Sequence, residues 1–398
     1  MSLFDAAERF AAIDRSKVIL DSKGCLHAHD QSSNCTACVD ICPVRAFTPG
    51  TPPVLNDQSC QSCLACLPVC PVGAIHADDD VSSLLNCATH VEDKAVELVC
   101  GLHPQPGSGA QPEGLAIRIQ ACLAGLGAGA YLSLAALGLE HISLRTDACQ
   151  ACKWASLEGQ VEQQARQANQ FLAGWNHADA VVCLSKVVQP VERPVWDAKN
   201  PPLSRRDLFR MLGRQGQVAM ARAMENGVRV SERQPGRDRL RILSALAHLP
   251  EAASPVNLDG LGFASMQVSE DCTACGVCSK ACPTQAIRLE KNADDSSFSL
   301  LFTAQKCIAC DICAILCMPD AIHLEKAPSF DQIFGADETL VVASGALVHC
   351  DKCKILMTAQ PGVRFCTLCE HRRSHPFGSI MPAKLKAQLK NAKKESKS

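Results

Sequence analysis

The sequence predicts an α+β multidomain protein in which two cysteine-rich modules flank a small α/β domain and a four-cysteine knuckle follows. Cysteines recur at spacings of two or three residues in two separate stretches, and apolar strands alternate with helical segments between them. Two Cys-x2-Cys pairs then stand close together near the C-terminus. We expect domains at 1–82, 83–190, 191–260, 261–330 and 331–398.

Cysteine is the most informative residue type in this chain. There are 26 cysteines in 398 residues and only 4% aromatic residues, so bound metal is expected to supplement a thin apolar core. Residues 1–18 carry charges throughout and lack the apolar run of a secretory signal, which favours the reducing cytoplasm and metal-bound thiolates over disulfides. The uncharged run 121–139 is mainly Ala and Gly and indicates a buried helix. We expect neither a membrane span nor a nucleic-acid partner.

The strongest motif is a duplicated run of cysteines between residues 272 and 317. Three cysteines spaced by two residues wrap a tight loop around one face of a 4Fe–4S cluster, and the fourth, close before a proline, crosses to the second cluster. A zinc site would leave this crossed ligand unexplained. The motif therefore predicts a dicluster ferredoxin-like domain. Its cluster C is expected to use Cys272, Cys275, Cys278 and Cys317, and its cluster D Cys307, Cys310, Cys313 and Cys282.

A second copy of the motif near the N-terminus lacks one cysteine. Ser32 stands where its first ligand should be, and Cys25 lies on a polar stretch long enough to fold back into that place. We expect Cys25 to be the missing ligand, with a spare thiol as the alternative, and we expect His27 and His29 to be solvated. Cluster A is then Cys25, Cys35, Cys38 and Cys70, and cluster B is Cys60, Cys63, Cys66 and Cys42.

The region 83–190 has the pattern of a small α/β domain. Apolar segments at 96–100, 116–122, 141–149 and 179–184 are expected to be strands of a mostly parallel sheet, with helices at 129–138 and 157–174. Its cysteines fall near the carboxyl ends of these strands, where open α/β sheets bind ligands. A 2Fe–2S cluster is the favoured occupant, and a redox dithiol at the last two cysteines or inert buried thiols are the alternatives. The expected ligands are Cys100, Cys122, Cys149 and Cys152, while Cys87 and Cys183 receive no role.

Two further segments complete the chain. Residues 191–260 are rich in Arg and Pro and are expected to form a linker with short helices, whose arginines lie along the acidic cluster domains or a partner. The knuckle has two Cys-x2-Cys pairs with twelve residues between them, which favours zinc bound by four sulfurs in a zinc-ribbon-like site. A single iron or a further iron–sulfur cluster is the alternative. The ligands would be Cys350, Cys353, Cys366 and Cys369, followed by a Lys-rich tail.

These motifs resemble known families. Residues 25–76 and 272–323 resemble dicluster bacterial ferredoxins. Residues 95–185 resemble the delta subunit of methyl-viologen-reducing hydrogenase, a small 2Fe–2S domain, through VELVC, IQAC and DACQAC, although a long insertion follows Cys100. The resemblances imply an electron-transfer subunit that works beside a hydrogenase or a molybdenum or tungsten formate dehydrogenase.

The function expected from the sequence is a multi-cluster electron conduit. No Gly-rich dinucleotide fingerprint follows a strand, and no Ser, His and Asp signature is recognisable, so we expect no separate substrate site. Two rivals stay open. One is an accessory or maturation protein that uses Cys149 and Cys152 as a reactive pair, and the other is a redox sensor that signals by losing cluster A.

Overall fold

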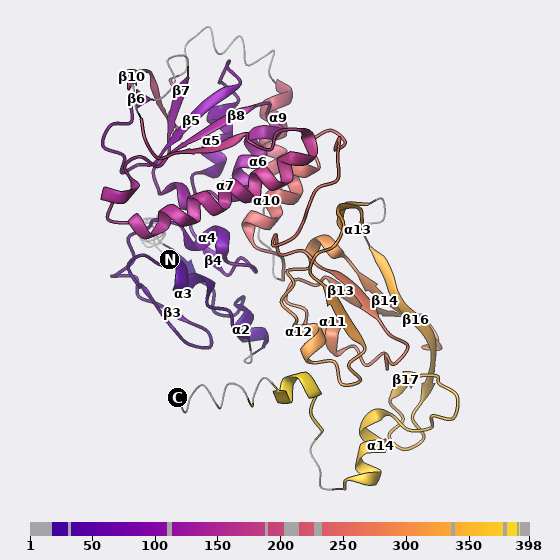
Figure 1. Cartoon of the computed structure of the whole chain (residues 1–398). Helices are drawn as coiled ribbons and strands as arrows, with labels where there is room; N and C mark the ends of the chain where they lie inside the picture. Colours follow the sequence, from indigo (N-terminus) through magenta and orange to yellow (C-terminus); the bar gives the residue numbers. More distant parts are fainter. Residues whose placement is uncertain are drawn as a thin grey trace, which may run out of the picture. The chain divides into compact units, whose positions relative to one another are not determined.

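The structure is a computed structural model that describes residues 18–30, 33–109, 114–187, 190–202, 215–226, 233–335, 339–376, 380–387 and 390 (Figure 1). The chain forms two compact units. Unit 1 comprises residues 1–25, 36–232 and 236–256, and unit 2 comprises residues 26–35, 233–235 and 257–398. Ser32 and the end of the Lys-rich tail, residues 391–398, lie outside the described residues.

The first part of unit 1 is built from very short elements around cysteine side chains. Two antiparallel pairs form, β1 (Ile19–Leu20) with β4 (Ile75–His76) and β2 (Phe47–Thr48) with β3 (Val54–Leu55). The helices α3 (Ala37–Ile41) and α4 (Cys66–Val69) contact each other. Phe47, Leu64 and Ile75 share their buried core with Cys25, Cys66 and Cys70. Thiols therefore supply much of the interior of this region.

A five-stranded parallel sheet forms the centre of unit 1, in the order β11-β7-β5-β8-β9. Its strands are β5 (Ala95–Val99), β7 (Leu115–Arg118), β8 (His141–Arg145), β9 (Val181–Leu184) and β11 (Val195–Asp197). The four strands expected from the sequence are confirmed as β5, β7, β8 and β9. The chain passes from β5 to β7 and then crosses back over β5 to β8, so the carboxyl ends of β5 and β8 flank a topological switch point.

Helices cover this sheet. The longer helices are α5 (Val81–Ala88), α6 (Ala128–Ala136), α7 (Glu158–Leu172), α9 (Gln215–Asn226) and α10 (Arg237–Leu246), with short turns η1 (Leu123–Gly125), η2 (Cys149–Ala151), η3 (Ala155–Leu157) and η4 (Ala173–Trp175). Figure 1 shows α6 beside α10, and α6 also packs against α7. The uncharged run is confirmed as a buried helix, because α6 is buried from Ala128 to Leu134. Among the described residues, no helix is both long and apolar enough to cross a membrane.

The segment beyond residue 190 contributes to unit 1. The strand β10 (Val191–Glu192) pairs with β6 (Ser108–Gly109), and β11 adds the edge strand next to β7. Arg241 binds Asp79 through contacts of 3.0 Å, and Arg237 adds a further 3.0 Å contact to the same carboxylate. Asp79 is 7% exposed and follows the N-terminal cysteine region directly. The stretch expected to be a linker therefore supplies a sheet edge and packed helices, and two of its arginines lie along the N-terminal cysteine region.

Unit 2 combines a cysteine-rich core with an antiparallel sheet. Its helices are α2 (Leu26–His29), α11 (Val277–Ala281), α12 (Ile312–Ile315), α13 (Phe330–Phe334) and α14 (Thr367–Ser374), with the turn η5 (Ala304–Lys306). Its strands are β12 (Ser265–Val268), β13 (Ile287–Lys291), β14 (Ser297–Phe302), β15 (Ile322–Glu325), β16 (Leu340–His349) and β17 (Leu356–Thr358). β12 pairs with β15, while β13, β14, β16 and β17 form a four-stranded antiparallel sheet. That sheet connects the duplicated motif to the knuckle.

Candidate iron–sulfur and metal sites

The three complete Cys-x2-Cys-x2-Cys loops share one backbone conformation. In each loop the residue before the second cysteine and the residue after it have positive φ, a region that residues other than glycine seldom adopt. Residues that alternate between negative and positive φ turn their backbone N–H groups toward a common concave surface, which suits an anionic group. The residues are Ser62 (51°) and Leu64 (65°), Ala274 (52°) and Gly276 (73°), and Ala309 (53°) and Asp311 (61°).

The cysteines expected as fourth ligands share a second feature. Each accepts a hydrogen bond at its Sγ from the backbone N–H of the residue four positions later. Such bonds stabilise a negatively charged sulfur and therefore suit thiolates that bind a cluster. The bonds are Ala46 N to Cys42 (3.2 Å), Ala74 N to Cys70 (3.2 Å), Ala286 N to Cys282 (3.2 Å) and Ala321 N to Cys317 (3.3 Å).

The structure gathers the four cysteines of cluster C around one cavity of about 370 Å³. Leu289 and Leu300 from the strands β13 and β14 form its apolar wall, together with Ile322. An apolar, thiol-lined space of this kind fits a cubane held by four sulfurs. The cysteines that line it are Cys272, Cys275, Cys278 and Cys317.

Among the cysteines expected to bind cluster B, and likewise among those expected to bind cluster D, the charge on one thiol affects the pKa of another. Burial, together with charges on Cys307 and Cys282, raises the pKa of Cys310 to about 12. Burial also raises the pKa of Cys63, to which charges on Cys42 and Cys60 add. Protonated thiols are therefore favoured without metal, and cluster binding has to displace these protons.

Cluster A is gathered less completely. Cys25 and Cys70 belong to one buried core, and Cys38 packs against it. Cys35 lies in the segment 26–35 that groups with unit 2. The expectation that both histidines of this stretch are solvated is wrong for His27, which is 6% exposed and whose Nε2 donates to the carbonyl oxygen of Cys35 at 2.8 Å. His27 lies on the short helix α2, which the sequence pattern did not reveal.

Comparison with known families bears on both cysteine-rich regions. Residues 271–321 match the model of a 4Fe-4S dicluster domain, and residues 53–76 match that of a 4Fe-4S binding domain. The chain contains two ferredoxin-type domains. No curated protein matches the chain. The first match covers both halves of the duplicated motif, whereas the second starts after Cys42 and leaves out the half that contains Ser32.

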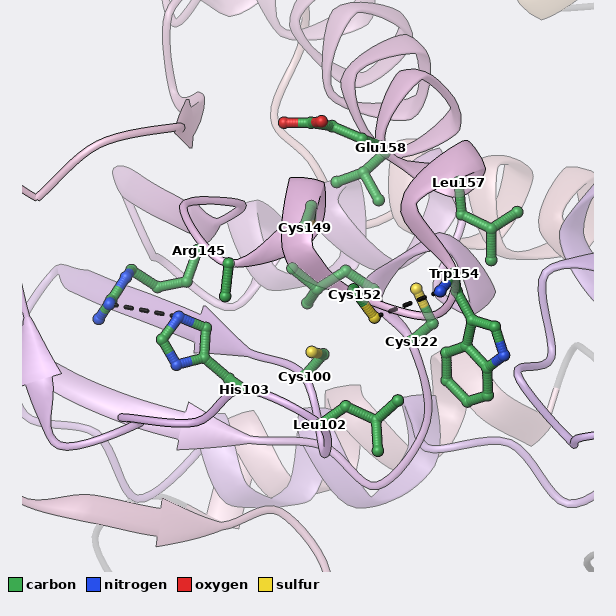
Figure 2. Close-up of a pocket in the computed structure, with 13 residues that line it drawn as sticks. Cys100, Leu102, His103, Cys122, Arg145, Cys149, Cys152, Trp154, Leu157 and Glu158 are labelled. Atoms are coloured by element: carbon green, nitrogen blue, oxygen red, sulfur yellow. Dashed lines mark hydrogen bonds between the residues drawn. The ribbon is translucent and has the colours of Figure 1, made fainter. Parts of the chain in front are cut away.

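A second cavity, of about 460 Å³, lies at the switch point of the parallel sheet (Figure 2). Cys100 follows β5, Cys122 precedes η1, and Cys149 and Cys152 lie after β8, so three separate loops bring the four expected cysteines together. Cys183 is not among the lining residues. Burial raises the pKa values of Cys122 and Cys149 to about 12 each. A raised pKa disfavours the thiolate that a reactive Cys149 would need, and a cluster bound here would have to displace the protons of these thiols.

We call the cavity lined by Cys100, Cys122, Cys149 and Cys152 the middle pocket. The charged residues beside it are paired with each other. The Arg145 Nε donates to Asp147 Oδ1 at 2.7 Å, and the His103 Nε2 lies 3.2 Å from the same oxygen. Glu97, 1% exposed, binds Arg193 and lies 3.6 Å from Arg145. Sequence reasoning missed His103, Arg145 and Trp154 as lining residues, because they lack any local motif and reach the pocket from different loops.

A negative charge on Cys63, in the cysteine loop 60–66, would also act on Cys122 in the middle pocket. It is among the causes that raise the pKa of Cys122, after burial and the charge on Cys100. The two groups of thiols therefore lie near each other within unit 1.

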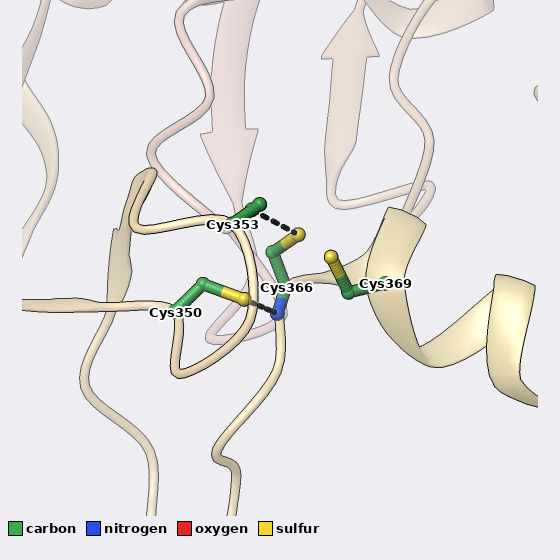
Figure 3. Close-up of side chains that lie close together, drawn as sticks. All are labelled: Cys350, Cys353, Cys366 and Cys369. Carbon is green, nitrogen blue, oxygen red and sulfur yellow. Dashed lines mark hydrogen bonds between the residues drawn. The ribbon is translucent and has the colours of Figure 1, made fainter.

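The knuckle holds four sulfurs within 4.8 Å of one another (Figure 3). The Sγ atoms of Cys353 and Cys366 are 3.7 Å apart, close to the separation of about 3.8 Å expected for sulfurs 2.3 Å from a tetrahedral ion. Cys366 donates its backbone N–H to Cys350 Sγ at 3.3 Å. The backbone N–H groups of Cys353 and Cys366 lower the pKa of Cys350 to about 6, which favours a thiolate. The four are Cys350, Cys353, Cys366 and Cys369, and their arrangement fits a metal ion.

Proposed function

We propose that this chain is a cytoplasmic, multi-cluster electron-transfer protein that relays electrons between a redox enzyme of the hydrogenase or formate dehydrogenase class and a partner carrier. The observation that carries the proposal is the number of separate thiol groups, since two ferredoxin-type domains occur together with a third four-thiol pocket. One redox centre would suffice to exchange electrons with one partner, whereas several in one chain suit a conduit between two.

The proposed ligands follow the crossed pattern. Three cysteines of each loop bind one cluster and the fourth binds the neighbouring cluster. Cluster A would use Cys25, Cys35, Cys38 and Cys70, cluster B Cys60, Cys63, Cys66 and Cys42, cluster C Cys272, Cys275, Cys278 and Cys317, and cluster D Cys307, Cys310, Cys313 and Cys282.

The residues of the chain hold the clusters and adjust their electronic environment. When bound, a 4Fe–4S cluster supplies one-electron chemistry at a potential set by hydrogen bonds to sulfur, burial and nearby charge. The backbone N–H groups of Ala74, Ala286 and Ala321 donate to ligand sulfurs, which stabilises the added negative charge of the reduced state. Leu289 and Leu300 form an apolar wall of the space that cluster C would occupy.

For the middle pocket we propose a 2Fe–2S cluster bound by Cys100, Cys122, Cys149 and Cys152. The convergence of these thiols at a topological switch point supports it. The partner class rests on the resemblance of residues 95–185 to a hydrogenase delta subunit. In this role the chain is a subunit of an oxidoreductase without a substrate site of its own.

For the knuckle we propose zinc. The four sulfurs leave no position for water or substrate, as is usual in structural zinc sites, and their spacing suits a tetrahedral ion. Iron in the same ligand set is the outcome that would replace zinc.

The proposal is tested by anaerobic purification, metal and sulfide analysis, and EPR of the reduced protein. We expect about eighteen irons and about one zinc per chain, from four cubanes, one 2Fe–2S cluster and one knuckle ion. A total near eight irons would refute the four-cubane assignment.

The partner class needs its own experiment. Reduction of the purified chain is followed by its visible absorption, with H2 and a hydrogenase in one sample and formate and a formate dehydrogenase in another. Bleaching in one of them that depends on the enzyme supports the relay. An accessory role would instead appear as partner activation that is lost in Cys149→Ser with Cys152→Ser while every cluster signal stays.

A further inference from the structure

The loop that carries the first three ligands of cluster B, residues 60–66, lies directly against the wall of the middle pocket. Trp154 lines that pocket and is 7% exposed. Its indole Nε1 donates to Oε1 of Gln61 at 3.0 Å. Its backbone N–H donates to Sγ of Cys152 at 3.4 Å, as Figure 2 shows. One residue therefore bonds to a pocket cysteine on one side and to the cluster B loop on the other.

A second contact joins the same two loops. Gly125 ends the turn η1, which begins directly after Cys122. A Cβ atom placed on Gly125 would lie 2.9 Å from Cβ of Leu64 and 3.3 Å from the carbonyl oxygen of Cys63. Both distances are shorter than ordinary carbon contacts, so the absence of a side chain at residue 125 is what lets the loops approach this closely.

We propose that electrons pass directly between cluster B and the group in the middle pocket, and that Trp154 and Gly125 are positioning residues that hold the two ligand loops together. The inference rests on the proposed function, because it requires both groups to be present. One electron leaves the reduced side and arrives at the oxidised side, and no bond or proton has to move. The cluster B loop is thus the entry from the N-terminal domain into the middle domain.

The hydrogen bond between Trp154 and Gln61 joins a buried side chain to an exposed one. Gln61 is exposed and its neighbour Cys60 is an expected ligand, yet the Gln61 side chain receives a hydrogen bond from an almost fully buried indole. Trp154 is separated from Cys152 by Lys153, whose Nζ lies 4.7 Å from the Trp154 ring centre. The local chain around Trp154 is therefore fixed from both sides, which limits variation in the distance between the two centres.

The test uses the full-length holoprotein and three variants at the contact. Gly125→Ala forces the loops apart, Trp154→Phe removes the indole donor, and Gln61→Ala removes the acceptor at an exposed position where folding should tolerate the change. Matched controls are Gly159→Ala, where nothing lies within 4 Å of the added atom, and Trp175→Phe, whose indole donates to Pro250 O at 2.7 Å elsewhere in unit 1. Gln58→Ala is the control for the exposed glutamine.

Three readouts are made on each protein. Iron and sulfide analysis reports cluster content, EPR relaxation reports the magnetic interaction between the reduced centres, and pulse radiolysis reports the rate of electron transfer between them. We expect unchanged cluster content, a weakened magnetic interaction, and a rate of electron transfer lowered several-fold in Gly125→Ala, because separating the two ligand loops lengthens the distance that the electron has to pass. The controls should match the wild type.

The outcomes separate this inference from the proposed function. If the wild type lacks an EPR signal from the middle pocket, the proposed 2Fe–2S site is refuted, and so is the junction, by which we mean direct electron transfer between cluster B and that pocket. If both signals are present but show no magnetic interaction, or if Trp154→Phe and Gln61→Ala leave rate and interaction at wild-type values, the junction alone is refuted. Loss of clusters in Gly125→Ala leaves the decision to the other two variants.

Discussion

The two ferredoxin-type domains differ in their first halves. In unit 2 both loops of the duplicated motif place residues of positive φ on each side of the second cysteine. In the N-terminal domain only the loop 60–66 does so. Thr36, which follows Cys35 as Gly276 follows Cys275, has a φ of −119°. The reversed loop conformation therefore accompanies the complete set of three cysteines, and the half that carries Ser32 departs from it.

The N-terminal domain is also hydrogen-bonded to the rest of unit 1. Asp80 accepts hydrogen bonds from the backbone N–H groups of Gln120 (3.1 Å) and Ala121 (2.8 Å) in the α/β region. Gly236 donates its N–H to Pro71 at 2.7 Å. Bonds to distant segments of unit 1 thus hold the chain at Pro71, after α4, and at Asp80, before α5.

Removal of all iron should produce the largest loss of structure, and we expect that loss to differ between the two ferredoxin-type domains. We expect the cysteine loops 272–282 and 307–317, which lie outside the strands of unit 2, to lose amide protection in hydrogen exchange, while β5 and β8 keep theirs. Residues 66–80 should stay partly protected through Asp80 and Gly236. Equal loss of protection in both cysteine-rich domains would contradict this comparison.

The next largest effect tests the unusual ligand. Replacing Cys272 by Ala should remove most of cluster C, whereas Cys25→Ala should convert cluster A to a 3Fe–4S centre with a loss of about one iron. Iron analysis and EPR of the oxidised protein measure both. Cys183→Ala is the control, because Cys183 does not line the middle pocket. A Cys25→Ala variant with the EPR spectrum and iron content of the wild type would make Cys25 a spare thiol.

Loss of the Asp79 charge should destabilise unit 1. Asp79→Asn leaves the buried guanidinium of Arg241 without its carboxylate, which costs about 3–5 kcal/mol in free energy of unfolding at neutral pH. Urea unfolding followed by tryptophan fluorescence measures it. The control is Glu162→Gln, which removes an exposed ion pair with Arg166 and should change little.

The same substitution predicts a pH dependence. Burial alone would raise the pKa of Asp79, but Arg241 and Arg237 outweigh it and hold the pKa below its usual value. The stabilisation is therefore present above the unfolded-state pKa of about 3.9 and is lost as pH falls through the lower folded value. The difference between wild type and Asp79→Asn should shrink at acid pH, and an undiminished difference at pH 3 would exclude this charge as its source.

The smallest expected effect concerns the link between knuckle and cluster C. The Thr358 hydroxyl donates to the carbonyl oxygen of Cys272 at 2.7 Å, and Gln360 Nε2 donates to Glu270 O at 3.1 Å. Thr358→Val should cost about 1 kcal/mol and alter the EPR signal of cluster C while leaving cluster B unchanged. Thr303→Val, which breaks a hydroxyl bond to Thr339, is the control. Identical cluster C signals in the wild type and Thr358→Val would deny this link.

Much of this organisation follows from spacing within short segments. The Cys-x2-Cys-x2-Cys loops, the two Cys-x2-Cys pairs of the knuckle and the four strands of the α/β region could be predicted, because their signals lie within a few residues of each other. The edge strand β11 could not, because Val195–Asp197 is too short for a periodic pattern and gains its place only by pairing with β7. The burial of His27 was missed for the same reason, since α2 spans four residues.

The sequence by itself determined which cysteines belong to a common loop, because closing a loop of a few residues leaves the backbone little choice. Tertiary structure alone decided which loops meet. Cys100, Cys122 and Cys149 approach one another only because β5, β7 and β8 are parallel neighbours with their carboxyl ends at one edge. The approach of Gly125 to Leu64 likewise depends on packing between residues far apart in the chain. The need for a residue without a side chain at position 125 follows from that packing and from no local motif.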